Sequence, residues 1–178
     1  MTTSVRTATP DDAALLHEVA AATFALACPP HTTQEAIADF IATTLSETSF
    51  AGYLDDPTRV LLIAEIDGAA AGYTMLVFAE PQDPDVAAAL TTRPTAELSK
   101  VYVAEGHHGA GVGPALMDAS LAAARARSVA AVWLGVNQLN AKANRFYEKN
   151  GFAIVGTKGF MVGGRREDDF VRELVFDA

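Results

Sequence analysis

A glycine-rich segment near the middle of the chain has the residue types of an anion-binding loop. Residues 105–114 read Glu-Gly-His-His-Gly-Ala-Gly-Val-Gly-Pro, between a predicted strand and a predicted helix. Glycine permits tight turns and a close approach of the backbone to a ligand. The first turn of the following helix offers unpaired N–H groups and the positive end of a helix dipole, which suits a pyrophosphate. Pro114 fits that first turn because its missing N–H would be spare there.

Two common phosphate-binding motifs do not match this loop. A P-loop needs a lysine and a serine or threonine after its last glycine, and neither follows here. The dinucleotide fingerprint Gly-x-Gly-x-x-Gly begins at Gly109 or at Gly111, but Pro114 or Leu116 then stands where the third glycine is needed. For the loop taken alone, its interpretation as a glycine-rich turn that binds no ligand therefore remains possible.

A second segment with chemically useful side chains lies further along the chain. It reads Asn140-x-x-Ala143-x-x-Phe146-Tyr147-x-x-x-Gly151-Phe152. Asn140 can cap the helix that it begins, and Asn150-Gly151 is a frequent left-handed helix end. Tyr147 is then either a core tyrosine with a satisfied hydroxyl or a proton donor at a site.

Together, the two segments resemble the GNAT superfamily of N-acetyltransferases. That family's core motif, Gln/Arg-x-x-Gly-x-Gly/Ala between a strand and a helix, reads here as His108-Gly109-Ala110-Gly111-Val112-Gly113. The preceding Val101-Tyr102-Val103 resembles the strand edge whose backbone pairs with the pantetheine arm of coenzyme A. The resemblance is tight from residue 97 to 152, where Trp133-Leu134-Gly135-Val136 resembles the next strand and the segment from Asn140 resembles the second cofactor segment.

The resemblance implies acetyl-CoA as the co-substrate, with no metal. It assigns cofactor contacts to the residues from Val101 to Val103, from His108 to Pro114, and to Asn140 and Tyr147. His108 departs from the family's Gln or Arg, which makes any side-chain contact to pyrophosphate weaker or pH-dependent. Asn140 is explained equally by capping, by a pantetheine contact, or by both.

A narrower resemblance is to the polyamine acetyltransferase (PaiA-like) branch. It is carried by Ala22-Thr23-Phe24, by the Gly72-Tyr73 strand, and by Gly159-Phe160-x-x-Gly163 with Asp169. An acidic residue often stands in that branch where Ser99 stands here, which leaves the position of the general base open between Glu97, the region of Ser99 and a water chain.

The chemistry implied is direct acetyl transfer within a ternary complex. An amine of pKa ~10 is mostly protonated at neutral pH, so a base or a water chain must deprotonate it. We take Glu97 as the candidate base, because strand alternation puts Glu97, Ser99, Val101 and Val103 on one face. An exposed strand glutamate explains Glu97 equally well. Tyr147 is the candidate acid for the leaving thiolate, and a backbone N–H between Val101 and Val103 is the candidate oxyanion donor.

Other reactive residues have simpler explanations. His107 and His108 point apart on an extended segment, which disfavours a metal site. Cys28 has no base beside it in the sequence and is interpreted as a small buried residue. The charges from Arg165 to Asp169 are interpreted as a solvated turn.

The elements expected around these segments give a mixed α/β (α+β) fold in one domain spanning residues 1–178. We expect a mostly antiparallel GNAT-type sheet of six to seven strands, flanked by about four helices. Predicted strands cover residues 4–8, 60–66, 72–79, 96–103, 131–136, 152–157 and 171–176. Predicted helices start at Thr9-Pro10 and at Thr32 or Thr33, and cover 112–127 and 140–149; residues 80–95 form a loop with a short helix near 86–90.

Two further details are predicted. Leu15, Val19, Ala22 and Leu26 form the apolar face of the first helix, and a capping box joins Thr32 to Glu35. Residues 159–169 form a glycine-rich, charged turn between the last two strands.

Composition limits the partners. The 178-residue chain is 50% hydrophobic, is 20% charged and carries a net charge of −9 without a basic run, which argues against nucleic acid. No apolar stretch is long enough for a signal peptide or a membrane span, and a single cysteine suits a reducing cytoplasm. Family habit implies a homodimer.

The leading hypothesis is therefore an N-acetyltransferase acting on a small amine, with a polyamine as first candidate. Alternatives are acetylation of a protein N-terminus, a lysine, an amino acid or an amine-bearing antibiotic. A non-catalytic acyl-CoA binder that regulates a partner, and an unrelated nucleotide-binding domain, are the competitors from other classes.

Overall fold

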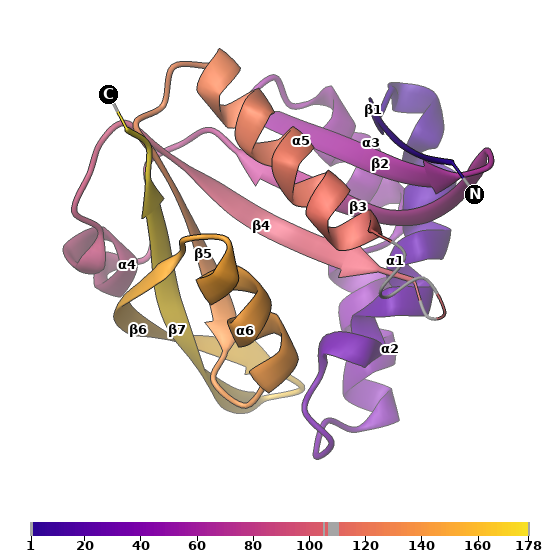
Figure 1. Cartoon of the computed structure of the whole chain (residues 1–178). Helices are drawn as coiled ribbons and strands as arrows, with labels where there is room; N and C mark the ends of the chain where they lie inside the picture. Colours follow the sequence, from indigo (N-terminus) through magenta and orange to yellow (C-terminus); the bar gives the residue numbers. More distant parts are fainter. Residues whose placement is uncertain (1, 105, 107–110, 178) are drawn as a thin grey trace.

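The computed structural model describes residues 2–104, 106 and 111–177. In these ranges a single seven-stranded sheet is flanked by helices on both faces (Figure 1). The strands are β1 (Thr3–Thr7), β2 (Arg59–Ile66), β3 (Ala69–Val77), β4 (Thr95–Val103), β5 (Ala131–Asn137), β6 (Ala153–Val162) and β7 (Arg165–Val175). The helices are the 3-10 turn η1 (Pro10–Asp12), α1 (Ala13–Ala27), α2 (Gln34–Thr44), α3 (Glu47–Asp55), α4 (Pro84–Ala89), α5 (Val112–Ala126) and α6 (Ala141–Lys149).

The sheet has the order β1-β2-β3-β4-β5-β7-β6, and every neighbouring pair is antiparallel except β4 and β5. This confirms the expected mixed fold with a mostly antiparallel sheet. The described residues form more helices than the four expected, because α3 was not predicted and the short α4 is a regular helix.

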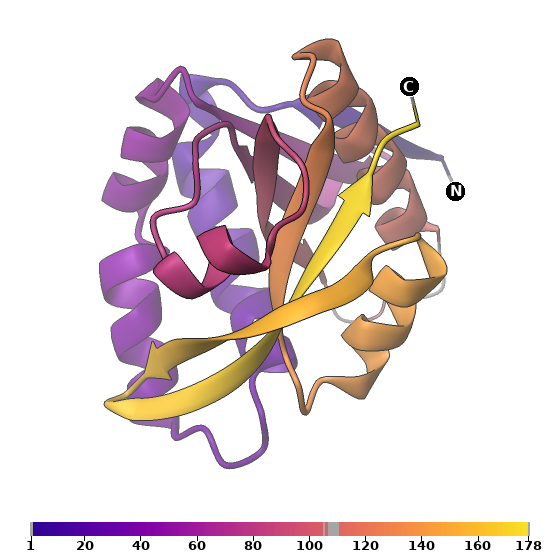
Figure 2. The same ribbon diagram turned by 90° about the vertical axis from the view of Figure 1, so that its left-hand side faces the viewer.

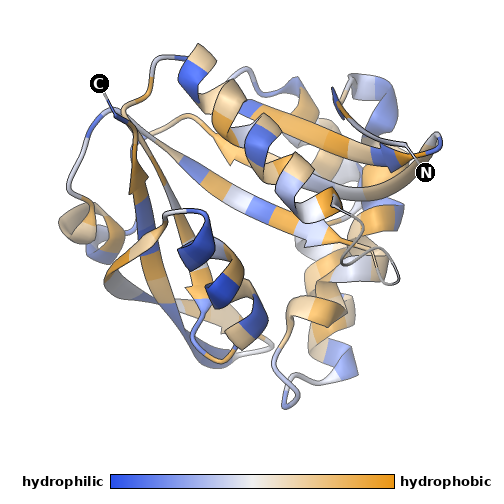
Figure 3. Ribbon diagram, in the orientation of Figure 1, coloured by the Kyte–Doolittle hydropathy of each residue, from blue (hydrophilic) through white to orange (hydrophobic). Residues whose placement is uncertain are grey.

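Helices cover the two faces of the sheet unequally. α5 crosses one face of β1 to β4, and α1 and α3 pack together on the opposite face (Figures 1 and 2). The strand β2 beneath α5 is largely apolar, whereas polar residues interrupt β4 (Figure 3). This difference is the first sign that one side of β4 serves a purpose other than core packing.

The predicted buried face of α1 is wrong. The residues that the structure buries are Ala13, Leu16, Ala20, Thr23 and Phe24, whereas Leu26 is 47% exposed. Leu15 and Val19 are only partly buried at the edge of the same cluster. Because this helix is apolar on nearly all sides, spacing alone does not select the side that meets the sheet.

The start of α2 resolves the choice between two threonines. Thr33 is the N-cap, and its hydroxyl accepts a hydrogen bond from the N–H of Ala36 at 3.1 Å. The capping box expected between Thr32 and Glu35 is therefore wrong: Thr33 caps the helix alone, because Ala36 has no side-chain acceptor to complete a box. The unpredicted α3 begins in the same way, because Ser46 accepts from the N–H of Ser49 at 3.0 Å and Phe50 is fully buried.

The two hairpins differ in how well the sequence predicts them. Asp67 and Gly68 both have positive φ, of 50° and 86°, and form the expected tight turn between β2 and β3. The turn expected over residues 159–169 is wrong, since β6 and β7 continue through it and only Gly163 and Gly164 turn. The long hairpin reaches α2 (Figure 2), where a Cβ on Gly163 would lie 2.5 Å from the Cβ of Ala36.

Among the described residues, no helix is both long and apolar enough to cross a lipid bilayer.

Candidate active site

The site begins where β4 and β5 separate. The two strands pair in parallel only from Thr95 to Glu97, opposite Ala131 to Trp133, and then diverge (Figure 1). Beyond Glu97, β4 thus has a partner strand only on the β3 side. The N–H of Ala104 donates to the carbonyl of Ala71 on β3 at 2.8 Å, so strand alternation turns the N–H groups of Val101 and Val103 toward the opening.

A β-bulge in β4 changes which side chains face which way. Met75 pairs with Lys100 and Leu76 pairs with Leu98, which leaves Ser99 without a partner residue on β3. The single face predicted for Glu97, Ser99, Val101 and Val103 is therefore wrong. Val101 and Val103 pack on the α5 side.

The opposite side of β4 carries the polar and aromatic side chains. Tyr102 packs with the core beneath α1, and Lys100 lies over the ring of Tyr53 in α3. Glu97 and Met75 reach this same side, because Glu97 faces Val77 and Met75 faces Lys100 in the β3–β4 ladder. The bulge thus puts Glu97, Lys100 and Tyr102 together.

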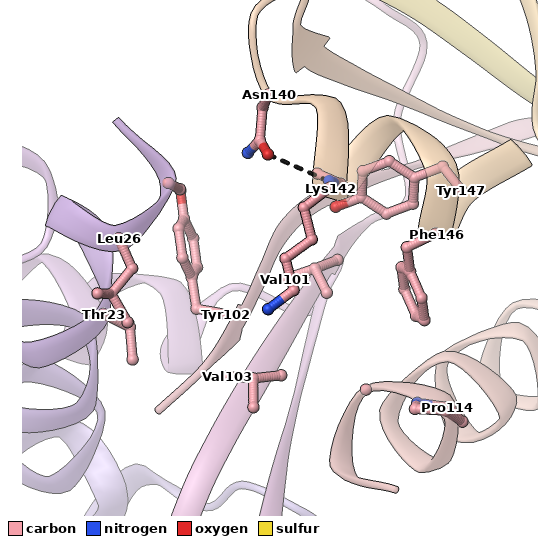
Figure 4. Close-up of a pocket in the computed structure, with 13 residues that line it drawn as sticks. Thr23, Leu26, Val101, Tyr102, Val103, Pro114, Asn140, Lys142, Phe146 and Tyr147 are labelled. Atoms are coloured by element: carbon pink, nitrogen blue, oxygen red, sulfur yellow. Dashed lines mark hydrogen bonds between the residues drawn. The ribbon is translucent and has the colours of Figure 1, made fainter. Parts of the chain in front are cut away.

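A first cavity of about 480 Å³ occupies the opening between β4 and α6 (Figure 4). Gly113 and Pro114 of α5 line it, together with Val101, Tyr102 and Val103. Gly111 has a φ of 82° at the N-cap of α5, a left-handed conformation that favours glycine. The side chain of Val112 is fully buried in the core, so only its backbone is available to a ligand. His108, Gly109 and Ala110 lie outside the described residues.

The helix α6 supplies the other wall of this cavity. Asn140 caps the helix, and its Oδ1 accepts from the N–H of Ala143 at 3.1 Å. The capping role predicted for Asn140 is thus confirmed, and its side chain also lines the cavity. Tyr147 points into the opening from the same helix (Figure 4), and burial raises the pKa of its phenol above the ordinary range.

A second cavity of about 480 Å³ adjoins the first, on the side of α1, α2 and the β6–β7 hairpin. The two cavities share a wall made by Ala27, Val101, Tyr102, Asn140, Ala143 and Tyr147. Glu97 lines the second cavity, where burial raises the pKa of its carboxyl against the opposing pull of Lys158, Lys100 and Arg59. The structure therefore brings both sequence-predicted acid–base residues, Glu97 and Tyr147, to one cavity.

Sequence reasoning missed the side chain of Tyr102. Its ring stacks on Tyr73 with centroids 5.6 Å apart, and it lines both cavities. Burial raises the pKa of Tyr102, and the neighbouring Tyr147, Cys28 and Asp169 add to that shift. The alternation of Val101, Tyr102 and Val103 carried a signal, because one face of a half-buried strand must differ from the other.

Two buried carboxylates on β7, those of Glu167 and Asp169, also line the second cavity. They alternate with the exposed Asp168, so the solvated turn predicted for residues 165–169 is wrong. Glu167 contacts His31 and accepts from the amide of Asn137 at 3.2 Å, and these hydrogen bonds lower the pKa of Glu167.

Asp169 is less well satisfied than Glu167. Its Oδ2 lies 3.4 Å from the Nζ of Lys158, while its buried Oδ1 has no hydrogen-bond donor among the described residues. Burial raises the pKa of Asp169, and Lys158 opposes that shift. Gly135 makes room for the pair, because a Cβ there would lie 2.4 Å from the Cε of Lys158. No sequence motif marks this arrangement across three strands.

Cys28 lines the same cavity but is a poor nucleophile. Its thiol donates to the carbonyl of Phe24 at 3.4 Å, and burial, with a smaller effect of Glu167, raises its pKa to about 11. The thiol therefore stays protonated near neutral pH. In the part of the chain that the structure describes, no cluster of three His, Cys, Asp or Glu residues could hold a metal ion.

A mostly antiparallel sheet that opens between its two parallel strands, with adjoining cavities at the opening, is the arrangement of a GNAT-type fold. Residues 21–152 match the model of the acetyltransferase (GNAT) family. An uncharacterised N-acetyltransferase of Mycobacterium tuberculosis is 46% identical over 166 residues, which cover 92% of this chain and 99% of that protein. The chain therefore belongs to the acetyltransferase (GNAT) family and is an acetyl-CoA-dependent N-acetyltransferase.

More distant similarities agree with this assignment. Streptothricin acetyltransferase of Streptomyces lavendulae is 31% identical over 110 residues, or 62% of this chain and 52% of that protein. The fold is similar to that of a PaiA N-acetyltransferase from Thermoplasma acidophilum, solved with coenzyme A, with a TM-score of 0.78, 20% identity and coverage of 99% and 100% of the two chains. It is also similar to the ribosomal-protein-S18-alanine N-acetyltransferase of Escherichia coli, with a TM-score of 0.72, 18% identity and coverage of 99% and 96%.

Proposed function

We propose that this enzyme transfers an acetyl group from acetyl-CoA directly to the primary amine of a small molecule, within a ternary complex. The observation that carries the proposal is the shared wall of the two cavities, in which Tyr147 and the free edge of β4 meet both spaces. A donor in the first cavity and an acceptor in the second would touch at this wall. Direct transfer then needs no acetyl-enzyme, which agrees with the protonated state of Cys28.

The residues of the first cavity fit a coenzyme A. The first turn of α5, from Gly111 to Pro114, has N–H groups without a side-chain cap and would hold the pyrophosphate. The free backbone edge at Val101 and Val103 would pair with the pantetheine amides, and Asn140 lies beside their path. Contacts from His108, Gly109 and Ala110 stay predictions of the resemblance. Bound acetyl-CoA supplies the activated thioester.

Glu97 and Tyr147 divide the proton transfers. The raised pKa of Glu97 makes it a better base near neutral pH, so it takes a proton from the amine as the C–N bond forms. The raised pKa of Tyr147 keeps its hydroxyl protonated, so it donates to the sulfur as the C–S bond breaks. The N–H of Val101 or Val103 faces the opening and would stabilise the oxyanion between these steps.

The acceptor class is the finer part of the proposal. A polyamine of the PaiA type is the first candidate, supported by the fold similarity and by the carboxylates of Glu97, Glu167 and Asp169 in the second cavity. A peptide or protein amine and an antibiotic amine are the enzymatic alternatives. A non-catalytic acyl-CoA-binding regulator is the alternative from another class. We also propose one catalytic domain over residues 1–178, a cytoplasmic location and a homodimer.

The test is thiol release from acetyl-CoA with a panel of polyamines, amino acids, aminoglycosides and peptides. We expect turnover with one acceptor class and a kcat lowered by about 10²–10⁴-fold in Tyr147→Phe, because a positioned general acid contributes about that much. The dissociation constant of acetyl-CoA, measured by calorimetry, is the control and should change little.

The outcomes distinguish an enzyme from a non-catalytic regulator and test the role of Tyr147. Acetyl-CoA binding without turnover on any acceptor would favour the regulator. Full activity in Tyr147→Phe would remove Tyr147 as the acid while leaving the acetyltransferase assignment intact.

A further inference from the structure

A third cavity, of about 480 Å³, lies beside the second cavity, in which we place the acceptor, on the same side of β4. The two share a wall formed by Glu97, Ser99, Lys100 and Lys158. Tyr147 belongs instead to the wall that the second cavity shares with the first. A molecule with its amine beside Tyr147 therefore meets the third cavity at its far end.

Two cations in this cavity lie over one aromatic ring. The guanidinium carbon of Arg59 lies 5.0 Å from the centroid of the Tyr53 ring, and the Nζ of Lys100 lies 5.6 Å from it. Arg59 has a partner in Asp56, at 3.2 Å. Lys100 has neither an ion pair within 4.0 Å nor a hydrogen bond to any residue that the structure describes. A partly buried ammonium that has no close counter-ion and lies beside a second cation indicates a site for an anion.

The carboxylates around this cavity do not supply that counter-ion. Glu80 at the rim is bound to Arg93 at 3.1 Å, and Asp83 caps α4 by accepting from the N–H of Asp85 at 2.9 Å. Glu97 is the acidic group of the shared wall. It favours the charged form of Lys100, yet burial and Arg59 outweigh it, and the pKa of Lys100 falls to about 8.

The other cation of the shared wall, Lys158, already has interaction partners. Lys158 pairs with Asp169 and also lies over the ring of Phe160, with its Nζ 5.2 Å from the ring centroid. Hence Lys100 is the cation in this wall whose ammonium is left to meet a ligand.

We propose that Lys100, assisted by Arg59, binds a carboxylate of the acetyl acceptor, so that the acceptor is an amine that also carries a carboxylate. The inference rests on the proposed acetyl transfer to a small-molecule amine, and it changes the first acceptor candidate from a polyamine to an amine that carries a carboxylate. It favours an amino acid or a related amino-carboxylate over an unsubstituted polyamine, because a polyamine would bring another cation toward Lys100 and Arg59. The amine lies between Glu97 and Tyr147, and the carboxylate reaches toward the third cavity.

The experiment uses acceptors matched except for one carboxylate. They are ω-amino acids from glycine to 6-aminohexanoate, each with the alkylamine of equal length, and lysine with cadaverine. In the wild type we expect kcat/KM for at least one amino-carboxylate to exceed that of its partner by about tenfold or more, as charge-assisted hydrogen bonds contribute. Lys100→Met should abolish this preference through KM. Because Lys100 also lowers the pKa of Glu97, any change in kcat should be the same for both members of each matched pair.

Two further variants serve as controls. Lys100→Arg keeps the charge and should retain part of the preference. Lys149→Met removes an exposed lysine at the end of α6, away from the three cavities, and should behave as the wild type.

Two readouts do not depend on acetyl transfer. Calorimetry with coenzyme A present should detect tighter binding of an N-acetylated amino-carboxylate than of its carboxylate-free partner, and only when Lys100 is intact. The Tm of Lys100→Met should be unchanged or higher, because an apolar chain of similar length replaces a desolvated cation. A purely structural lysine would give a lower Tm.

Equal kinetics and equal binding of the matched pairs in the wild type would overturn the inference. So would a Lys100→Met variant that loses all acceptors equally, or a wild type that prefers polyamines. If coenzyme A binds but no acceptor is acetylated, the proposed function fails, and the binding of the acetylated pairs still decides the anion site.

Discussion

Lys100 and Glu97 show how burial changes the protonation of single residues in the candidate site. Both side chains leave the same side of β4, and burial disfavours the charge on each, lowering the pKa of Lys100 and raising that of Glu97. The opposite charges partly offset the effect of burial. The pKa of each group therefore lies closer to neutral pH than it would in water, and such shifted pKa values are typical of functional sites.

The titration of Lys100 should be visible in stability. Its pKa is lower in the folded protein, at about 8, than in the unfolded chain, at about 10.4. Below pH 8 both states carry the proton and the folded state bears the full penalty of a buried cation. Between these values the unfolded state binds more protons, so stability rises with pH.

We therefore expect the difference in free energy of unfolding between Lys100→Met and the wild type to shrink from pH 8 to pH 10. Urea denaturation at four pH values across this range measures it. Parallel curves for the two proteins would contradict the lowered pKa.

Over the same range the wild type should lose its preference for carboxylate-bearing acceptors, because neutral Lys100 has no charge with which to bind a carboxylate.

At the scale of elements, the start of α6 both caps the helix and lines the first cavity. Asn140 caps the helix through Ala143, and Asn144 ties the same turn to β5 by donating to the carbonyl of Asn137 at 3.1 Å. Arg172 of β7 donates to Asn144 at 3.0 Å. This network fixes the first turn of α6 and therefore the direction in which Tyr147 enters the site.

Two variants of Asn140 separate its roles. Asn140→Ala should lower the free energy of unfolding by about 1 kcal/mol, the usual effect of losing a cap. Asn140→Asp should restore stability, since aspartate caps equally well. If coenzyme A affinity falls in both variants, the amide contacts the cofactor as well; if it recovers in Asn140→Asp, capping explains Asn140 alone. Denaturant midpoints and calorimetry together give the answer.

At the scale of the whole molecule, the sheet consists of two parts joined by a short seam. β1 to β4 form one part, β5 to β7 form the other, and the parallel ladder between them covers three residue pairs. A shared core, with Leu98 from β4 and Leu134 from β5, supports the seam. A ligand that fills the opening contacts both parts and should oppose their separation.

Coenzyme A should therefore raise the Tm in a concentration-dependent way. At a concentration of 100 times Kd it should add about 2.7 kcal/mol to the free energy of unfolding. Val103→Pro removes the N–H that faces the opening without removing a β3–β4 hydrogen bond, so this shift should become smaller. Val103→Ala keeps the N–H and should retain the shift. Thermal denaturation measures all three proteins, and equal shifts would mean that the β4 edge does not hold the cofactor.

The sequence by itself determined most of the elements and the family, but not α3 or the length of the β6–β7 hairpin. Turn and cap residues act locally, so Asp67-Gly68, Asn140 and Gly151 marked their boundaries without knowledge of the fold. The two segments that carry the family resemblance were readable for the same reason, because each lies on one stretch of chain. Glu97 and Tyr147 were found from their place beside those segments.

What only the tertiary structure decided involves contacts between distant strands. The bulge at Ser99 depends on the register with β3 and reverses the facing of every later residue in β4, which strand alternation alone predicted wrongly. The Lys158–Asp169 pair needs the gap left by Gly135 on another strand, and Lys100 meets Arg59 over a ring from α3. Such sites arise from packing between segments far apart in sequence, and no local pattern records which side chains will meet.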